Sequence, residues 1–146
     1  MTRRRNLIAS VLLVTTLCVT AAPWLIYWIA LGKIEGRPRH ATHTVTADEV
    51  DSLCKRLRIS QPVQIEPISP YSYISYILQG APGSASTRIA WIIAQSHNVE
   101  HLSDRRNWHL SGAALTIWLT RNWTPTELIA RAIELENRTA TSAVPQ

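Results

Sequence analysis

The sequence predicts a mainly α-helical protein in which a single N-terminal transmembrane helix carries a small helical domain with at most a short pair of strands. Three observations lead to this fold class. Residues 7–31 contain no charged side chain, and residues 108–123 are the most apolar stretch outside that run. Two further segments begin with the Thr-x-x-Glu capping box of a helix, at Thr46 and at Thr124. With 146 residues, the chain has room for one domain beside the anchor.

The uncharged run predicts that residues 1–31 comprise a cytoplasmic tip and a transmembrane signal anchor. About 20 apolar residues span the hydrocarbon core of a bilayer. Hydroxyl groups in the run can bond to the backbone of their own helix, and Pro23 predicts a kink. A cleaved signal peptide is the alternative, because Val19-Thr20-Ala21 fits a small-residue cleavage site. The apolar run continues past that site through Trp24–Ile29, which favours an uncleaved anchor.

The charges beside the run predict its orientation. Arg3–Arg5 favour a cytoplasmic N-terminus, and Trp24, Tyr27 and Trp28 are typical of the outer membrane interface. We therefore expect a single pass through the inner (cytoplasmic) membrane, with the C-terminal domain outside the cytoplasm. From Lys33 onward, 12 Lys and Arg residues face ten Asp and Glu. No basic stripe lies on a predicted helix, so nucleic acid is not an expected partner.

The chain after the anchor is expected to begin with a linker at residues 32–45, because glycine, proline and mixed charges occur there without an apolar period. Residues 46–138 then form the small helical domain. Its first helix begins at Thr46 and runs to about Arg58, and Glu49 completes the capping box. The apolar face of this helix consists of Val50, Leu53, Cys54 and Leu57.

The middle of the domain is less clearly patterned. Residues 62–68 alternate between apolar and polar and are bounded by prolines, which predicts a short edge strand or an extended segment. Residues 71–78 follow Ser69-Pro70, which is a favourable start for a helix. They are also rich in residues that favour strands, so both a helix and a second strand stay open. A further helix is expected over residues 87–96.

The last predicted helix begins at the second capping box, with Pro125 at its first position. Its core-facing residues are Leu128, Ile129, Ala132 and Ile133. Asn137 suits a C-terminal cap. Residues 139–146 are therefore expected to form a disordered tail.

The expected central helix, residues 108–123, contains three tryptophans and a run of small residues. At helical spacing, one face consists of Trp108, Ser111, Gly112, Leu115, Trp118 and Leu119. The small residues form a notch that allows another backbone to approach closely. A buried core helix explains this pattern, and a ligand groove with indole walls is the functional interpretation. The candidate binding residues are Trp108, Gly112, Trp118 and Trp123.

The candidate catalytic carboxylates lie just before this helix. Glu100 and Asp104 are four residues apart, so on a helix they would share one face and raise each other's pKa. His97 and His101 have the same spacing, but the His-Glu-x-x-His order is absent and no third ligand is evident. The sequence therefore predicts no metal site. It has no glycine-rich phosphate-binding loop, and no cofactor is expected.

Residues 111–122 are similar to Gly-Gly-Ser-Thr-Ile-Thr-Gln-Gln-Leu-Ala-Lys-Asn, a signature of the peptidoglycan glycosyltransferases. Residues 92–97 resemble the Val-Ile-Ala-Ser-Glu-Asp segment of the same family. These are lysozyme-like, mostly helical, single-anchor periplasmic enzymes that polymerise lipid II. In this register Ser96 occupies the position of the catalytic Glu, and Trp118 that of the first Gln of the signature. The Arg-Lys-x-x-Glu motif has no match. The resemblance thus implies a degenerate, truncated relative that has lost polymerase activity.

These observations predict a membrane-anchored envelope protein whose domain binds a partner or the cell wall without catalysis. The expected partners are the lipid bilayer and either a cell-wall glycan or another envelope protein. One alternative is a peptidoglycan-acting, glycosyltransferase-like enzyme that uses Glu100. The other is a small subunit of a membrane complex, whose anchor packs against another span through Ser10, Thr15, Thr16 and Thr20.

Overall fold

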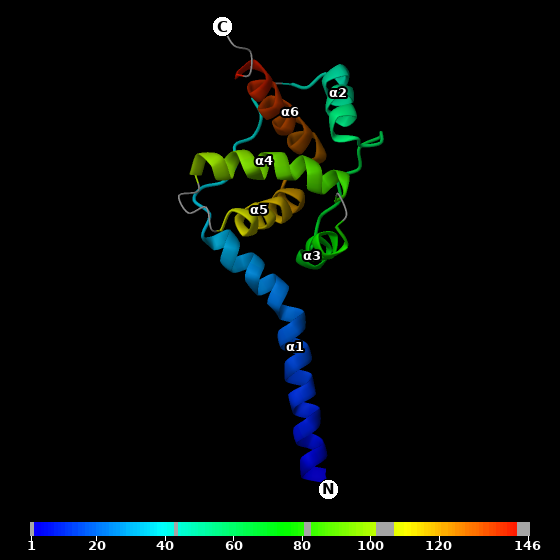
Figure 1. Cartoon of the computed structure of the whole chain (residues 1–146), viewed down its shortest axis with the longest axis vertical. Coiled ribbons are helices and arrows are strands. Elements are labelled where there is room, and N and C mark those ends of the chain that lie inside the picture. The colour runs from blue at the N-terminus through cyan, green and yellow to red at the C-terminus, as the bar shows by residue number, and fades with distance from the viewer. Residues whose placement is uncertain (1, 43, 81–82, 102–106, 143–146) are drawn as a thin grey trace.

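The computed structural model describes residues 2–42, 44–80, 83–101 and 107–142, with the backbone alone for residues 2–9 and 140–142. Within these ranges the chain forms six α-helices and no β-strand, which confirms the prediction of a mainly helical protein (Figure 1). The helices are α1 (Thr2–Gly32), α2 (Ala47–Leu57), α3 (Pro70–Gln79), α4 (Ala85–His101), α5 (Trp108–Asn122) and α6 (Pro125–Ser142).

Helix α1 is long and apolar enough, over Ser10–Gly32, to cross a membrane. Its first part projects from the other helices, and the helix bends on its way to them (Figure 1). Pro23 lies inside it and accounts for a bend of this kind. The hydroxyl of Thr16 donates to the carbonyl of Leu12 over 2.8 Å, and that of Thr20 donates to the carbonyl of Thr16 over 2.9 Å. The hydroxyls of Thr16 and Thr20 are thus satisfied within the helix, as the sequence predicts.

The last turns of α1 belong to the folded domain. Tyr27, Ala30 and Leu31 are buried, and α1 packs against α3 and α5. Ile34 and Pro38, in the segment that the sequence predicts to be a linker, are buried as well. The chain therefore passes from α1 into the domain core, and then along the domain surface, with apolar side chains packed on both sides of Gly32.

Helix α5 is the centre of the packing, because it contacts α1, α3, α4 and α6. The sequence predicts one apolar face, whereas the middle of the helix is buried on almost every side, including Ala114, Thr116, Ile117 and Thr120. The predicted notch of small residues is filled by the indole of Trp91 on α4. A Cβ atom at Gly112 would lie 2.6 Å from Cζ3 of Trp91, which is closer than carbon atoms pack.

The capping signals are confirmed. At the start of α2, the backbone N–H of Thr46 donates to Glu49 over 2.9 Å, and the N–H of Glu49 donates to the Thr46 hydroxyl. Thr124 and Glu127 make the same reciprocal pair at the start of α6. Ser69 caps α3, and Pro70 is its first residue. Residues 71–78 are therefore helical rather than a second strand.

The predicted edge strand at residues 62–68 is not present, and residues 63–69 have no regular secondary structure. Two helices take up its hydrogen bonds instead. The N–H of Glu66 donates to the hydroxyl of Ser86 over 2.7 Å, and the N–H of Ile68 donates to the hydroxyl of Thr120 over 3.1 Å. These side-chain acceptors satisfy the backbone groups that a neighbouring strand would otherwise pair.

Two helices are longer than the sequence predicts. Helix α4 begins two residues earlier than expected and runs on to His101. Helix α6 continues through Asn137, the expected cap, to Ser142. Its extension is supported by the ion pair of Arg138 with Glu134 and by the Thr139 hydroxyl, which donates to the carbonyl of Glu136. Helix thus covers the first part of the tail predicted to be disordered, and residues 143–146 lie outside the described residues.

The notch at Gly112 can be tested by overpacking. Gly112→Leu should lower the free energy of unfolding by about 1–3 kcal/mol, because the new side chain meets the rigid indole of Trp91. Urea denaturation of the solubilised chain measures the change. In the matched control, Gly112→Ala is combined with Trp91→Ala, which removes the indole that the new Cβ would meet. The added alanine should then be tolerated, because alanine favours a helix over glycine by about 1 kcal/mol. Unchanged stability of Gly112→Leu would show that the notch is empty.

Candidate functional site

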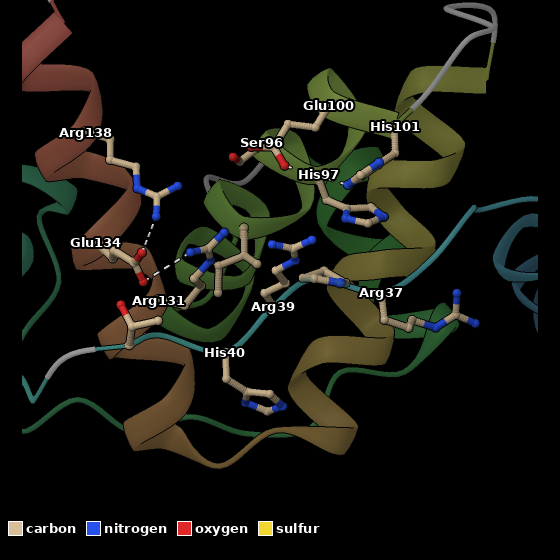
Figure 2. A pocket seen from close by; sticks show the side chains of 13 residues that line it. Arg37, Arg39, His40, Ser96, His97, Glu100, His101, Arg131, Glu134 and Arg138 are labelled. Atoms are coloured by element: carbon tan, nitrogen blue, oxygen red, sulfur yellow. Dashed lines mark hydrogen bonds and ion pairs between the residues drawn. The ribbon is translucent and has the colours of Figure 1, made fainter.

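A charged cavity lies between α4, α6 and the segment 37–42 that follows α1 (Figure 2). Its volume is about 260 Å³. The charged residues that line it are four arginines and two glutamates: Arg37, Arg39, Arg131, Arg138, Glu100 and Glu134. His40, His97 and His101 line it too. The cavity therefore has an excess of positive charge when the histidines are neutral, and a larger excess when any of them takes up a proton.

Helical spacing brings these side chains together. Ser96, His97, Glu100 and His101 follow one another at intervals of one, three and one residues, so α4 presents them on one face. Arg131, Glu134 and Arg138 are spaced by three and four residues on α6 and share a face in the same way. The two faces are opposed because α4 and α6 pack against each other. The segment 37–42 runs across the opening between them (Figure 2).

His97 joins this segment to α4. Its Nε2 lies 3.0 Å from the carbonyl oxygen of Glu35, which can only accept, so Nε2 carries the proton of the neutral ring. Burial lowers the pKa of His97, and the hydrogen bond to Glu35, which acts in the opposite direction, does not restore it. The ring is therefore neutral at pH 7, with the lone pair on Nδ1. The ring centroid of His101 lies 4.4 Å away.

The opposite wall of the cavity is a buried ionic cluster on α6. Glu134 lies between two guanidinium groups, 3.1 Å from Nη1 of Arg131 and 2.5 Å from Nη2 of Arg138. Burial alone would raise the pKa of Glu134, but the contact with Arg131 and the charges of Arg131 and Arg138 outweigh it and lower the pKa. Glu134 is thus ionised. Arg131 is only 8% exposed, and its Nε makes no hydrogen bond.

The structure does not bring the three predicted binding tryptophans together. Trp123 is buried and stacks on the ring of His40, with 4.2 Å between the ring centroids. Trp118 is half-buried, and the guanidinium carbon of Arg37 lies 5.3 Å from its ring centroid. Trp108 lies at the other end of α5, in a separate hollow that Glu100 also lines. An indole-walled groove along α5 therefore does not form.

The other predicted site residues are placed as follows. Gly112 is buried against Trp91 and serves packing. Glu100 is exposed on α4, and its Oε2 lies 3.7 Å from Nε2 of His101. Asp104 lies outside the described residues. Among the residues that the structure describes, no group of three or more His, Cys, Asp or Glu side chains is arranged to hold a metal ion.

The arginines are the part of the cavity that sequence reasoning missed. Arg37 and Arg39 lie in a segment that has no periodicity, so nothing in the pattern predicts where their side chains point. On α6 the sequence did contain an indication, because Arg131 and Glu134 directly flank the core residues Ala132 and Ile133. Charged residues so close to the buried face of a helix are buried only when they are paired, and this spacing could have indicated the ionic cluster.

No family model, no curated protein and no solved structure matches the chain.

Proposed function

We propose that the chain is a membrane-anchored envelope protein that binds, without catalysis, an acidic group of a cell-wall glycan or of another envelope protein. The observation that carries this proposal is the cavity between α4 and α6, where Arg39, Arg131 and Arg138 outnumber two glutamates. Guanidinium groups recognise carboxylates and phosphates through charge-assisted, often paired, hydrogen bonds. The cavity's chemistry therefore fits an anionic ligand.

Arg131 supports this proposal because it is held in place but not fully paired. Glu134 and the helix packing fix its guanidinium at the cavity wall, while Nε is buried without an acceptor. Because Nε has almost no exposed surface, an anion in the cavity would interact with the charge of the Arg131 guanidinium rather than accept a hydrogen bond from Nε. Figure 2 shows the Arg39 side chain pointing into the same space, whereas that of Arg37 points away. Arg131 and Arg39 are thus the proposed contacts for the anion.

The size of the cavity suggests what part of a partner it takes. A volume of about 260 Å³ is below the range typical of sites that enclose a whole drug-sized ligand. It suits a single acidic substituent, such as a carboxylate or a phosphate on a larger polymer or protein. The rest of the partner would then lie on the surface formed by α4, α6 and the segment 37–42.

The chemistry of the cavity favours binding over catalysis. Glycoside chemistry uses a carboxylic acid that can donate a proton together with a second carboxylate. Glu134 is poorly suited to donate a proton, because two arginines keep it ionised. In the register that resembles the glycosyltransferases, Ser96 stands at the position of the catalytic Glu and cannot replace a carboxylic acid. An enzyme that uses Glu100 is therefore the second candidate.

The proposed location is the inner membrane, with α1 as an uncleaved single span and the domain outside the cytoplasm. The arginines at the N-terminus favour this orientation. Cleavage after Ala21 is disfavoured, because the apolar run continues well past that site through Trp24–Ile29. Alkaline phosphatase fused after Gln146 should be active in a bacterial host. An inactive fusion beside an active cytoplasmic reporter at the same position would contradict the orientation.

Anion binding can be tested with inorganic pyrophosphate as the probe, by calorimetric titration of the full chain in neutral nanodiscs at low salt. Arg39→Gln should weaken binding about three- to tenfold, as expected for one exposed charge-assisted contact. Arg58→Gln removes an equal charge from an exposed position outside the cavity and should leave binding unchanged.

Glu100→Gln supplies the opposite control at the same site. It removes a negative charge from the cavity lining, so it should leave pyrophosphate affinity unchanged or raise it. The enzyme alternative predicts that this variant abolishes turnover of lipid II or peptidoglycan by the purified chain. If Arg39→Gln and Arg58→Gln weaken pyrophosphate binding equally, the probe responds to the overall charge of the chain and not to the cavity. That result would contradict the proposal.

A further inference from the structure

Helix α3 has an unusually apolar exposed face. The face that points away from the domain carries Tyr71, Ile74, Ile77 and Leu78, which are 43%, 40%, 66% and 81% exposed. Its half-buried residues include the hydroxyl-bearing Ser72 and Ser75. The helices of soluble proteins place their apolar stripe toward the core and their polar residues outward. This exposed face therefore suits an apolar environment.

The sequence around α3 contains no charged side chain. Between Glu66 and Arg88 there is no Asp, Glu, Lys or Arg. Leu110 of α5 is 43% exposed and extends the apolar surface next to α3. A contiguous apolar surface of this kind marks a site that meets a membrane or another protein.

The position of α3 beside α1 decides between these two. The hydroxyl of Tyr71 donates to the backbone carbonyl of Thr20. Thr20 precedes Trp24 by four residues, which corresponds to about 6 Å along a helix axis. Helices that lie in a membrane interface bury their apolar face about 5–10 Å into the boundary of the headgroups and acyl chains. If Trp24 and Trp28 mark the interface, the start of α3 is at that depth.

A groove between α1, α3 and α5 opens on the same side. Its volume is about 120 Å³, and the residues that line it are almost all apolar, including Pro23, Ile26, Tyr73, Ile77, Leu110 and Ile117. Pro23 and Ile26 belong to the span that is apolar enough to cross a membrane. The groove is therefore continuous with the surface that acyl chains would cover on α1, and its dimensions suit part of one such chain.

We propose that α3 is an interfacial membrane helix, whose exposed face lies among the lipid acyl chains of the leaflet beside α1, with one chain entering the groove between α1, α3 and α5. This inference rests on the proposed function only in that α1 must span a bilayer. It does not depend on the anion cavity. The domain then meets the membrane at two places, the end of α1 and the outer face of α3.

The test places an environment-sensitive NBD fluorophore at single cysteines in the full chain, reconstituted in phosphatidylcholine vesicles, with Cys18 and Cys54 replaced by alanine. The probe site is Leu78→Cys, at an exposed position of α3. Val14→Cys reports on the bilayer interior around α1, and Ser52→Cys, exposed on α2, reports on water. Vesicles that contain acyl-chain doxyl lipid quench only probes that reach the acyl chains.

We expect the Leu78 and Val14 probes to be quenched by doxyl lipid and to emit at shorter wavelength than the Ser52 probe. A Leu78 probe that behaves like the Ser52 probe, while the Val14 probe is quenched, would overturn the inference and leave the membrane span intact. A blue-shifted Leu78 probe that doxyl lipid does not quench would also overturn it, in favour of contact with a second protein. An unquenched Val14 probe would overturn the membrane span and the inference together.

Discussion

The burial of the last turns of α1 in the domain core is the interaction on which the rest of the structure depends. Tyr27, Ala30 and Leu31 pack against α5 and its neighbours rather than ending in a flexible tether. Because these turns are packed in the core, the part of α1 that follows Pro23 has a fixed direction relative to the domain. In the proposed topology the domain therefore lies directly on the bilayer, with α3 on the side that faces the lipid.

The short path from the end of α1 to the segment 37–42 also shapes the cavity. The chain leaves α1 at Gly32 and reaches Arg37 within five residues, so the anchor also positions one wall of the cavity. The hydrogen bond from His97 to the Glu35 carbonyl holds this segment against α4. Helix α6, which forms the opposite wall, lies on the other side of α4 from the projecting part of α1 (Figure 1). In the proposed topology, α6 and the cavity wall that it forms are therefore on the side of the domain away from the bilayer.

Much of the fold could be predicted from the sequence because its signals are local. Capping boxes, an uncharged run and a small-residue notch each act within a few residues, and the structure contains all three. The predictions that failed concern contacts between distant segments. The hydroxyls of Ser86 and Thr120 replace a partner strand for residues 62–68, and no local pattern reveals that. The cavity depends on two arginines that are far apart in the sequence, Arg39 in an aperiodic segment and Arg131 on α6. Only the packing of the helices brings them together.

Two matched leucine truncations in α1 test whether the end of this helix is part of the domain core. Leu31 is 4% exposed and Leu13 is 71% exposed. The account predicts that Leu31→Ala lowers the free energy of unfolding of the domain by about 2–5 kcal/mol, the usual cost of a large-to-small change in a core. Leu13→Ala should leave it unchanged. Pulse proteolysis in urea, with the chain in nanodiscs, measures both. Equal stability of the two variants would contradict the account.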